Sequence, residues 1–581
     1  MNDSYSGNLP EYPKNAVPIV YPVTLIVDPE SSCQSNNNSM ASLLEDNSLR
    51  LSLESSERNL FDCIQKACKA LAEGRVEGYP AKDVQVRVAG GWVRDKVLGM
   101  KSDDVDIALD NCTGEEFANC LKTYMQLFEH ETIGRIGVIA ANPDQSKHLE
   151  TATMKVCGIE VDFSNLRHEA YADDSRIPEI VIGTPVEDSY RRDFTINALY
   201  YNVHTNQVED WTRRGLKDLL ETRLVTTPLD AHHTFRDDPL RVLRAIRFAV
   251  RFGMELSDDL QEACMSTTIH QELHRKVSRE RVGKELEGML SGKHANPINA
   301  LQLICRLNLA GSIFCLPAED TIRGRLCSRN LEPFKCASEE LSVLKADAWE
   351  ESRKCIQILP SILRALRGDN NSNLTVFDPR LTYLAATILP FGKLEYEEKK
   401  KTKPIVEFMI REGIKFKNKD VIAVKTVFEH YEKMVQLLQV EPEVSKAVRL
   451  QTGLLLRDTR EMWVTTLAIA AVTLIRQQEQ VGEVSTFLER AQRWYSFIAS
   501  DLNLDGCWKL KPILNGKELV ELLEIPRGPI VGIYAQEQTE WILMNPEGTA
   551  EECREHLTMV KKKRENELPL SELQVAKKIH R

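Results

Sequence analysis

The hydrophobic pattern of this 581-residue chain changes its period near Pro228, and that change limits the folds open to it. Upstream, apolar residues recur at every second position in three short segments, as expected for half-buried strands. Those residues are Val84, Val86 and Val88, then Val105, Ile107 and Leu109, then Ile159, Val161 and Phe163. Downstream, long segments follow the helical period, and no fixed-period internal repeat is visible. The pattern predicts a small α+β head with a mixed sheet, followed by an all-α chain.

The domain division that we expect places linkers where composition shifts. The ranges are a flexible N-terminal extension over 1–57, the head over 58–227, a helical neck over 228–300, a helical body over 301–440 and a helical tail over 441–581. The polar tract 31–39 has nothing to bury, which favours a flexible start. Two further stretches, 368–373 and 395–403, are predicted as loops.

Composition narrows the classes of partner. Acidic residues outnumber basic ones by 86 to 75, so the formal net charge is −11. Any polyanionic partner must therefore meet a local basic surface. The longest charge-free apolar stretch, 462–475, is too short for a membrane span of about 20 residues. None of the 14 cysteines forms a C-x-x-C pair, which favours a reducing, intracellular location without a zinc or disulfide framework.

The segment VRVAGGWVRDKVLGMKSDDVDIAL, residues 86–109, reads as strand, glycine turn, helix, loop and strand. Gly90 and Gly91 carry no side chain, so another group can approach the backbone closely. The N–H groups at the start of the following helix favour phosphate, and Arg94 can add a bidentate contact. A purely structural turn is the alternative, and the G-x-G-x-x-G dinucleotide fingerprint is absent.

Asp104 and Asp106 lie one residue apart at the next strand. Period two places both carboxylates on one face, with Cα atoms roughly 7 Å apart. Such close like charges repel unless a cation lies between them, and oxygen ligands at this spacing suit Mg²⁺. A solvated sheet edge is the alternative for an isolated D-x-D. The preceding GG-x-V-R-D makes a metal site for phosphoryl transfer the favoured interpretation.

Asp162 alternates with Val161 and Phe163, so it faces away from the core. If its strand neighbours the D-x-D strand, Asp162 completes the metal site and helps to deprotonate an attacking hydroxyl. Otherwise it is a solvent-facing acid.

A helix with an arginine stripe follows the head. In DDPLRVLRAIRFAVRF, Asp237 or Asp238 is a suitable helix-capping acid, and Pro239 stands at an early helical position. The stripe consists of Arg241, Arg244, Arg247 and Arg251. Spacings of three, three and four place them on one face, which by itself is typical of a solvated surface.

Taken together, these motifs resemble the polymerase-β-like nucleotidyltransferases, and more narrowly the eukaryotic class II CCA-adding tRNA nucleotidyltransferases. The matching segments, in order, are GGWVRDKVLG with SDDVDIAL, RRDFTINAL at 191–199, RDDPLRVLRAIRF at 236–248, SRERVGKELEGML at 278–290 and KPILNGKELVELLEIPRGPIVG at 511–532. The resemblance covers about residues 60–565. Asp237 departs from it, since family members often carry Glu there.

The resemblance implies an enzyme that adds C, C and A to the 3′ end of tRNA from CTP and ATP, releasing pyrophosphate. Asp104 and Asp106 would bind Mg²⁺. The nucleotide phosphates or ribose would contact Gly91, Arg94 and Arg192, and Asp193 would favour ribose. The nucleotide-selecting helix would contain Asp238, Arg241, Arg244 and Arg247, and the tail would meet folded tRNA. A monomer in the cytoplasm and nucleus is favoured, with the mitochondrion as a further location.

Base selection follows from donors and acceptors. Cytosine and adenine each offer an amino donor beside a ring-nitrogen acceptor, which match the Asp238 carboxylate and the Arg241 guanidinium. Guanine and uracil would leave buried groups unpaired. Three alternatives remain open: a CC-only or A-only enzyme, a poly(A) polymerase, or a non-catalytic tRNA-binding protein.

Overall fold

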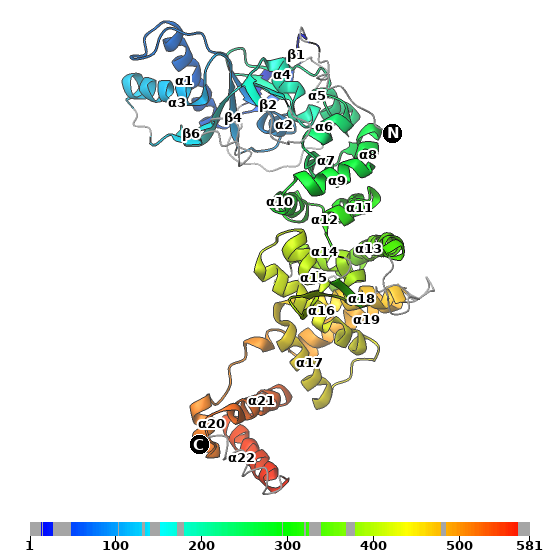
Figure 1. The fold of residues 1–581 in the computed structure, drawn as a ribbon. Coiled ribbons are helices and arrows are strands. Elements are labelled where there is room, and N and C mark those ends of the chain that lie inside the picture. The colour runs from blue at the N-terminus through cyan, green and yellow to red at the C-terminus, as the bar shows by residue number, and fades with distance from the viewer. Residues whose placement is uncertain are drawn as a thin grey trace. The chain divides into compact units, whose positions relative to one another are not determined.

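The structure is a computed structural model. It describes residues 13, 16–26, 48–102, 104–130, 134–139, 151–170, 179–292, 294–318, 321–324, 338–367, 378–477 and 484–567. The chain divides into two compact units, 1–313 and 314–581 (Figure 1). Within the described ranges, no helix is long and apolar enough to cross a membrane.

The first unit is built on a nine-stranded mixed sheet in the order β2-β1-β11-β10-β3-β4-β7-β6-β5. Its strands are β1 (Ile19–Ile26), β2 (Leu49–Ser52), β3 (Val86–Ala89), β4 (Val105–Leu109), β5 (Gly137–Ile139), β6 (Thr151–Val156), β7 (Ile159–Asn165), β10 (Leu199–Asn202) and β11 (Gln207–Asp210). β4 pairs with β7 in parallel and with β3 antiparallel. The three alternating segments identified in the sequence contribute β3, β4 and β7, so the mixed α+β head is confirmed.

Helices cover the apolar face of this sheet. α1 (Ser55–Ala72) and α3 (Gly114–Tyr124) lie side by side (Figure 1), and both contact β7. The rings of Phe117 on α3 and Phe163 on β7 are 5.5 Å apart. Val105 and Ile107 of β4 are fully buried, so the alternating polar residues of this strand face the other way. One face of β4 and β7 is therefore core, and the other is available for chemistry.

The flexible N-terminal extension expected over 1–57 is wrong where the structure describes it. β1 pairs antiparallel with β11 and in parallel with β2, and α1 begins at Ser55. The run IVYPVTLI of β1 is apolar enough to extend the sheet, and Leu49 and Leu51 of β2 are buried. The polar tract 31–39, which suggested flexibility, lies outside the described residues.

Two short connections complete the head. β8 (Arg167–Ala170) pairs with β9 (Glu179–Ile182), and α4 (Pro185–Tyr190) follows with a capping box from Thr184 and Glu187. The turn η4 (Thr195–Asn197) then leads into β10.

Helices dominate the first unit after Pro228, as the period predicted. They are α6 (Ala231–Asp237), α7 (Arg241–Phe252), α8 (Asp258–Met265), α9 (Thr267–Lys276), α10 (Arg279–Leu290), α11 (Pro297–Arg306) and α12 (Ala310–Ile313). The strand pair β12 (Leu224–Val225) and β13 (Glu255–Leu256) links this part to the head. α11 runs across the predicted neck–body boundary at 300, and the other boundaries stay predictions.

The second unit is mainly helical. Its principal helices are α13 (Ser338–Arg367), α14 (Pro379–Ile388), α16 (Asn418–Leu438), α17 (Lys446–Thr459), α18 (Trp463–Gln477), α19 (Val484–Ser496), α20 (Gly516–Leu523), α21 (Pro529–Met544) and α22 (Ala550–Glu567). These long helices agree with the helical period found in the sequence downstream of Pro228.

A small sheet interrupts this helical region, so the all-α prediction holds only as a mostly helical one. β14 (Ile322–Gly324), β15 (Leu394–Glu398) and β16 (Lys401–Pro404) form it, where 395–403 was predicted as a loop. Leu394 and Tyr396 alternate inward, and Lys399 and Lys400 both have positive φ, as a two-residue hairpin turn requires. The predicted loop at 368–373 lies outside the described residues.

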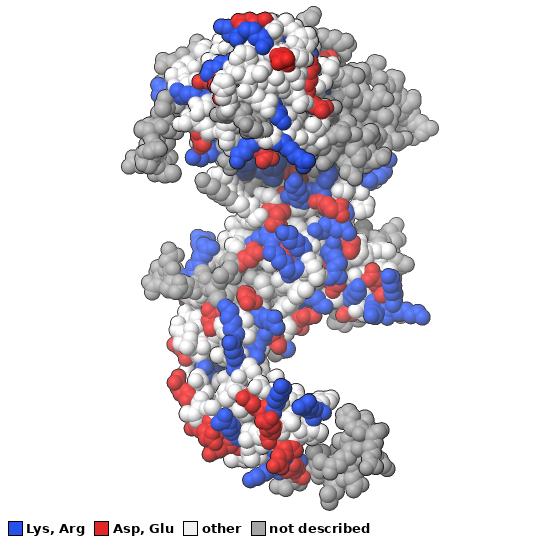
Figure 2. All heavy atoms as spheres, turned by 90° about the vertical axis from the view of Figure 1, so that its left-hand side faces the viewer, with Lys and Arg blue, Asp and Glu red and all other residues white. Residues whose placement is uncertain are grey.

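Surface charge is mixed on the face drawn in Figure 2, where Lys and Arg alternate with Asp and Glu. This agrees with the formal charge of −11, which requires basic contacts to be local.

Candidate active site

Three carboxylates lie on one face of the central strands. Asp106 of β4 is the direct register partner of Asp162 on the parallel strand β7. Asp104 precedes β4 by one residue, on the same side as Asp106 by strand period. Asp104 and Asp106 are exposed, and Asp162 is half-buried and accepts a hydrogen bond from the Thr153 hydroxyl of β6. The condition set for Asp162, that its strand neighbours the D-x-D strand, is met, and its role stays a prediction.

The Asp106 carboxyl is accessible yet recessed among protein atoms. Burial raises its pKa to about 6, and the nearby Asp104 and Asp162 carboxylates add to the rise. Arg192 and Arg167 oppose it with positive charge. A cluster of like charges that disfavours its own ionised form is suited to binding a divalent cation, which removes the repulsion.

The residues present fit a divalent ion that is only partly held by protein. Across the described part of the chain, no group of three or more His, Cys, Asp or Glu side chains is close enough to enclose a metal. Mg²⁺ keeps several waters and takes substrate phosphates as further ligands, so a few accessible carboxylates suffice.

The glycine turn before α2 (Gly91–Val97) makes room for an arginine. Gly90 has φ +62 and ψ −111, and a Cβ there would lie 2.7 Å from Nη1 of Arg192 and 3.2 Å from the Asn197 carbonyl oxygen. Gly91, which the family resemblance places at the phosphates, has no positive φ, and a Cβ there would lie 3.6 Å from Nη2 of Arg94. The positive φ and the close approach therefore both belong to Gly90.

Arg94 is buried rather than open to solvent. Its guanidinium donates to Asp95 and Asn197 and lies 5.0 Å and 4.6 Å from the ring centroids of Phe248 and Phe252 on α7. Burial lowers the pKa of Arg94. The structure thus places Arg94 between the glycine turn and α7.

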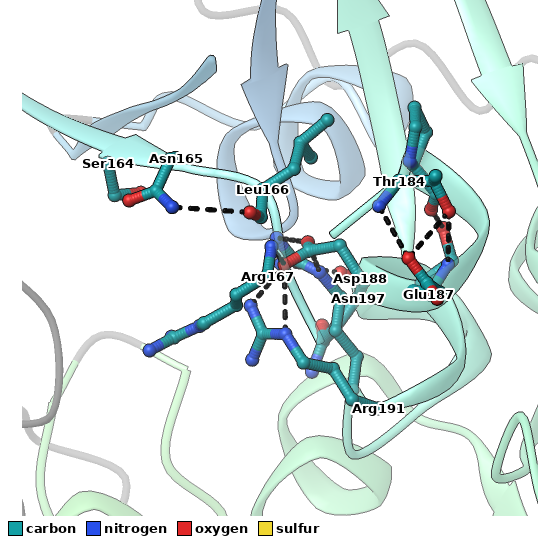
Figure 3. Close-up of polar contacts among 12 residues, drawn as sticks. Ser164, Asn165, Leu166, Arg167, Thr184, Glu187, Asp188, Arg191 and Asn197 are labelled. Atoms are coloured by element: carbon teal, nitrogen blue, oxygen red, sulfur yellow. Dashed lines mark hydrogen bonds and ion pairs between the residues drawn. The ribbon is translucent and has the colours of Figure 1, made fainter. Parts of the chain in front are cut away.

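A carboxylate that the sequence analysis missed, Asp188 of α4, gathers the two arginines of the R-R-D motif. It is 1% exposed and accepts hydrogen bonds from Arg191 Nε at 2.8 Å, Arg192 Nη2 at 2.9 Å and the Tyr200 hydroxyl. The Arg167 backbone N–H donates to it at 3.3 Å. Figure 3 shows Arg191 and the start of β8 converging on Asp188.

Ionisation of Asp188 is maintained by these neighbours. Burial would raise its pKa, but the Arg191 and Arg192 guanidiniums and the Tyr200 hydrogen bond outweigh burial and hold the pKa well below its usual range. The spacing of Asp188 from Arg191 and Arg192, three and four residues on, is a sequence signal that could have identified it.

Asp193 joins the head to α7. Its carboxylate accepts from the Phe194 backbone N–H and from Asn197 at 2.9 Å each, and from Arg244 Nε at 2.7 Å. Burial alone would raise its pKa, but Arg244 and the Asn197 hydrogen bond lower it to about 2. Asp193 and Arg244, which the resemblance named separately as site residues, are thus in direct contact.

Asp238 stands just before α7, but the residue that caps α7 is Leu240, without a side-chain capping bond, so the predicted cap at Asp237 or Asp238 is wrong. Oδ1 of Asp238 accepts from the Leu240 N–H at 3.2 Å, and its Oδ2 accepts from Arg281 of α10 at 2.9 Å. Arg241 donates to the carbonyl oxygens of Arg191 at 2.8 Å and Thr234 at 3.4 Å.

The remaining arginines of the stripe are also paired. Arg247 donates to Glu285 of α10 at 2.6 Å, and Arg251 donates to Asp95 at 3.3 Å. The stripe is therefore an interface between α7, α10 and the head rather than a solvated face. Arg281 and Glu285 were in a matched segment, but single-sequence reasoning assigned them no partner.

The domain type is visible in two comparisons. Residues 86–225 match the poly A polymerase head domain family. The solved structure of the Thermotoga maritima CCA-adding enzyme complexed with tRNA has a TM-score of 0.53 and 19% identity, covering 87% of this chain and 96% of that one. Together these matches define the fold: a head domain of the poly A polymerase type followed by a mostly helical part.

Similarity to two curated relatives identifies the family of enzymes to which the chain belongs. The mitochondrial CCA tRNA nucleotidyltransferase of Saccharomyces cerevisiae is 35% identical over 488 residues, covering 82% of this chain and 88% of that protein. The tRNA nucleotidyltransferase cca1 of Schizosaccharomyces pombe is 32% identical over 507 residues, covering 86% and 95%. This chain belongs to the family of class II CCA-adding tRNA nucleotidyltransferases. Enzymes of this family generally use a divalent metal.

Proposed function

We propose that this chain adds C, C and A to the 3′ end of tRNA from CTP and ATP and releases pyrophosphate. One observation carries the proposal: a chain of this family keeps three carboxylates, Asp104, Asp106 and Asp162, on one face of adjacent strands. A tRNA-binding protein that had lost catalysis would have no need to keep such mutually repelling groups together.

Asp104 and Asp106 are proposed to bind Mg²⁺, with Asp162 as a third carboxylate beside them. When bound, the ion supplies positive charge that stabilises the phosphates during displacement at the α-phosphate. Asp162 is proposed to accept the proton of the attacking 3′-hydroxyl, and the hydrogen bond from Thr153 supports a fixed orientation of its carboxylate.

The nucleotide is proposed to lie between the glycine turn and the R-R-D motif. Arg192 provides positive charge near Asp106. Gly91, which has no side chain, is proposed to let phosphate approach the backbone. Arg94, buried against α7, acts mainly by holding the turn in place. Asp193, beside Arg192, is proposed to accept a ribose hydroxyl.

The base is proposed to be selected by Asp238 and Arg241, as acceptor and donor for the edges of cytosine and adenine. Their present partners, Arg281 and the Arg191 carbonyl oxygen, support a preset orientation of both side chains. Arg244 and Arg247 support the helix through Asp193 and Glu285 and need not contact the base.

The names of the relatives support a proposed substrate and location. They name tRNA and CCA, and adding C and A to tRNA requires CTP and ATP as co-substrates. Because the Saccharomyces relative is named as mitochondrial, a mitochondrial pool is proposed beside the cytoplasmic and nuclear ones.

The decisive experiment supplies three tRNAs that lack CCA, lack only the final A, or are complete. Each is incubated separately with labelled CTP and labelled ATP in the presence of Mg²⁺. We expect CTP incorporation only on the first, ATP incorporation only on the second, and no extension of the third. Extension of complete tRNA would instead favour poly(A) synthesis, the activity for which the matched head domain is named.

The same assay tests the acids with an Asp104→Asn, Asp106→Asn double variant, which keeps side-chain shape and removes charge. Incorporation should fall by at least about 10³-fold, while tRNA binding by fluorescence anisotropy and the melting temperature change little. Undiminished incorporation would contradict the proposed metal site.

A further inference from the structure

The buried carboxylate of Asp188 has no part in the mechanism above, yet it is the most heavily hydrogen-bonded acid near the site. It faces two consecutive arginines, a tyrosine hydroxyl and a backbone N–H, and only 2% of its side chain is exposed. Isolated buried carboxylates are costly, so one that stays ionised among such partners must be compensated by them.

One arm of this network fixes Arg192. Its Nε donates to Asp188 at 3.1 Å and to the Tyr200 hydroxyl at 3.2 Å, and its Nη2 donates to Asp188 at 2.9 Å. Nη1 donates to the Asn197 carbonyl oxygen at 3.2 Å. A guanidinium has five N–H donors, so one N–H on each terminal nitrogen is left over for a further acceptor. The side chain is 20% exposed, which leaves that acceptor a way in.

The same guanidinium lies beside the glycine turn and near enough to Asp106 to act on it electrostatically. It lies against Gly90, where a Cβ would come within 2.7 Å of its Nη1, and its charge is felt at Asp106. Asp188 is therefore hydrogen-bonded to a cation whose charge acts on Asp106.

The other arm leads to the base-selecting helix. Asp188 accepts from Arg191 at 2.8 Å, and the Arg191 carbonyl oxygen accepts from Nη2 of Arg241 at 2.8 Å. Arg192, near the carboxylates, and Arg241, proposed to contact the base, are thus both connected to one buried acid, Asp188.

We propose that Asp188 is a positioning residue, which holds Arg192 for the nucleotide's phosphates and Arg191 beneath Arg241, without touching the substrate. This inference rests on the proposed function and extends it. Because both arms serve any nucleotide, loss of Asp188 weakens CTP and ATP alike and leaves the contacts to tRNA unchanged.

The test measures CTP and ATP dissociation constants by calorimetry, and the KM and kcat for each on tRNA. Asp188→Asn keeps the shape and removes the charge. We expect both dissociation constants and both KM values to rise by about tenfold, with tRNA affinity within twofold of the unmodified chain. Tyr200→Phe keeps the ring and removes one hydroxyl, so it covers the case in which Asp188→Asn does not fold. It should raise both constants about threefold.

A double-mutant cycle with Arg192→Gln separates positioning from general support. If Asp188 acts through Arg192, adding Asp188→Asn or Tyr200→Phe to Arg192→Gln changes nucleotide affinity by less than about twofold. Full additivity would overturn the proposal.

The matched control is Glu209→Gln. Glu209 is another buried carboxylate of the same sheet, paired with Arg87 at 2.7 Å and with Asn202 at 2.7 Å, and it has no place in the proposed mechanism. Glu209→Gln should lower the melting temperature with unchanged nucleotide affinity.

If Asp188→Asn and Tyr200→Phe behave as this control does, Asp188 is structural only. A different outcome is that the unmodified chain fails the three-tRNA assay while Asp188→Asn and Tyr200→Phe still raise the CTP and ATP dissociation constants as expected. In that case the proposed function is wrong and the positioning role of Asp188 stands.

Discussion

At the scale of single residues, the site depends on where a side chain is missing as much as on where one is present. Gly90 adopts a backbone conformation that is costly for any other residue, and the space beside its Cα is taken by the Arg192 guanidinium. The unusual backbone conformation and the close approach of Arg192 both occur at Gly90. A methyl group added there would therefore strain the backbone and collide with the guanidinium.

Gly90→Ala should therefore destabilise the first unit by about 2 kcal/mol and displace Arg192. We expect the KM for both CTP and ATP to rise about tenfold, because the displaced cation is the one proposed to meet the phosphates. Steady-state kinetics with each nucleotide and urea unfolding give the two measurements.

Gly99 provides the matched control, just after the end of α2. It too has a positive φ, of +69, but no atom lies within 4 Å of the place that a Cβ would take. Gly99→Ala should cost about 1 kcal/mol of stability through the backbone alone and leave both KM values unchanged. Equal kinetic effects of the two substitutions would show that collision with Arg192 is not the cause.

At the scale of elements, α1 holds α2 and thereby the glycine turn. Glu57 of α1 is buried and accepts from Lys96 Nζ at 2.6 Å and from Trp92 Nε1 at 2.9 Å, both on α2. The Trp92 ring also packs edge-on against Phe61 of α1 at 5.5 Å. This contact explains why the chain upstream of the head motifs belongs to the folded unit.

Lys96→Ala leaves the Glu57 carboxylate buried without its cation, so it should lower the free energy of unfolding by about 3 kcal/mol or more. Chemical unfolding followed by tryptophan fluorescence measures this, since Trp92 lies in the contact. The control is Lys101→Ala, whose pair with Glu54 is exposed and should contribute under about 0.5 kcal/mol. A small loss for Lys96→Ala would mean that α1 is held by apolar packing alone.

Local pattern was sufficient to predict the faces of β4 and β7, because alternation determines which side of a strand each residue takes. It was not sufficient for side chains whose surroundings come from distant segments. The sequence predicted Arg94 as a phosphate ligand, but in the structure its guanidinium packs against two aromatic rings of α7, a distant segment. Asp188 had a visible spacing to its arginines, but its burial depends on Tyr200 and β8. The strand β1 was missed because its partner β11 lies at the far end of the head sequence, with Ile19 opposite Asp210.

At the scale of the whole molecule, the excess of acidic residues shapes how the chain meets its proposed substrate. With a net charge of −11 and mixed signs on the face of Figure 2, the long-range field does not attract nucleic acid in general. Recognition of tRNA must then come from the folded shape of the tRNA and from local contacts to its phosphate backbone. A B-form DNA duplex has a different shape and places its phosphates differently.

Competition binding tests this consequence on the full chain. Labelled tRNA lacking CCA is bound at about 0.15 M salt, and unlabelled tRNA or B-form DNA duplex of equal phosphate content is added. We expect the duplex to compete at least about 100-fold less well than tRNA, because it offers phosphates without the fold that brings them to the local basic groups. Raising the salt should weaken tRNA binding in proportion to the few phosphates contacted, with a shallow slope of log affinity against log salt. Equal competition by duplex DNA, together with a steep slope, would mean that the chain binds polyanions through a broad basic face despite its overall charge.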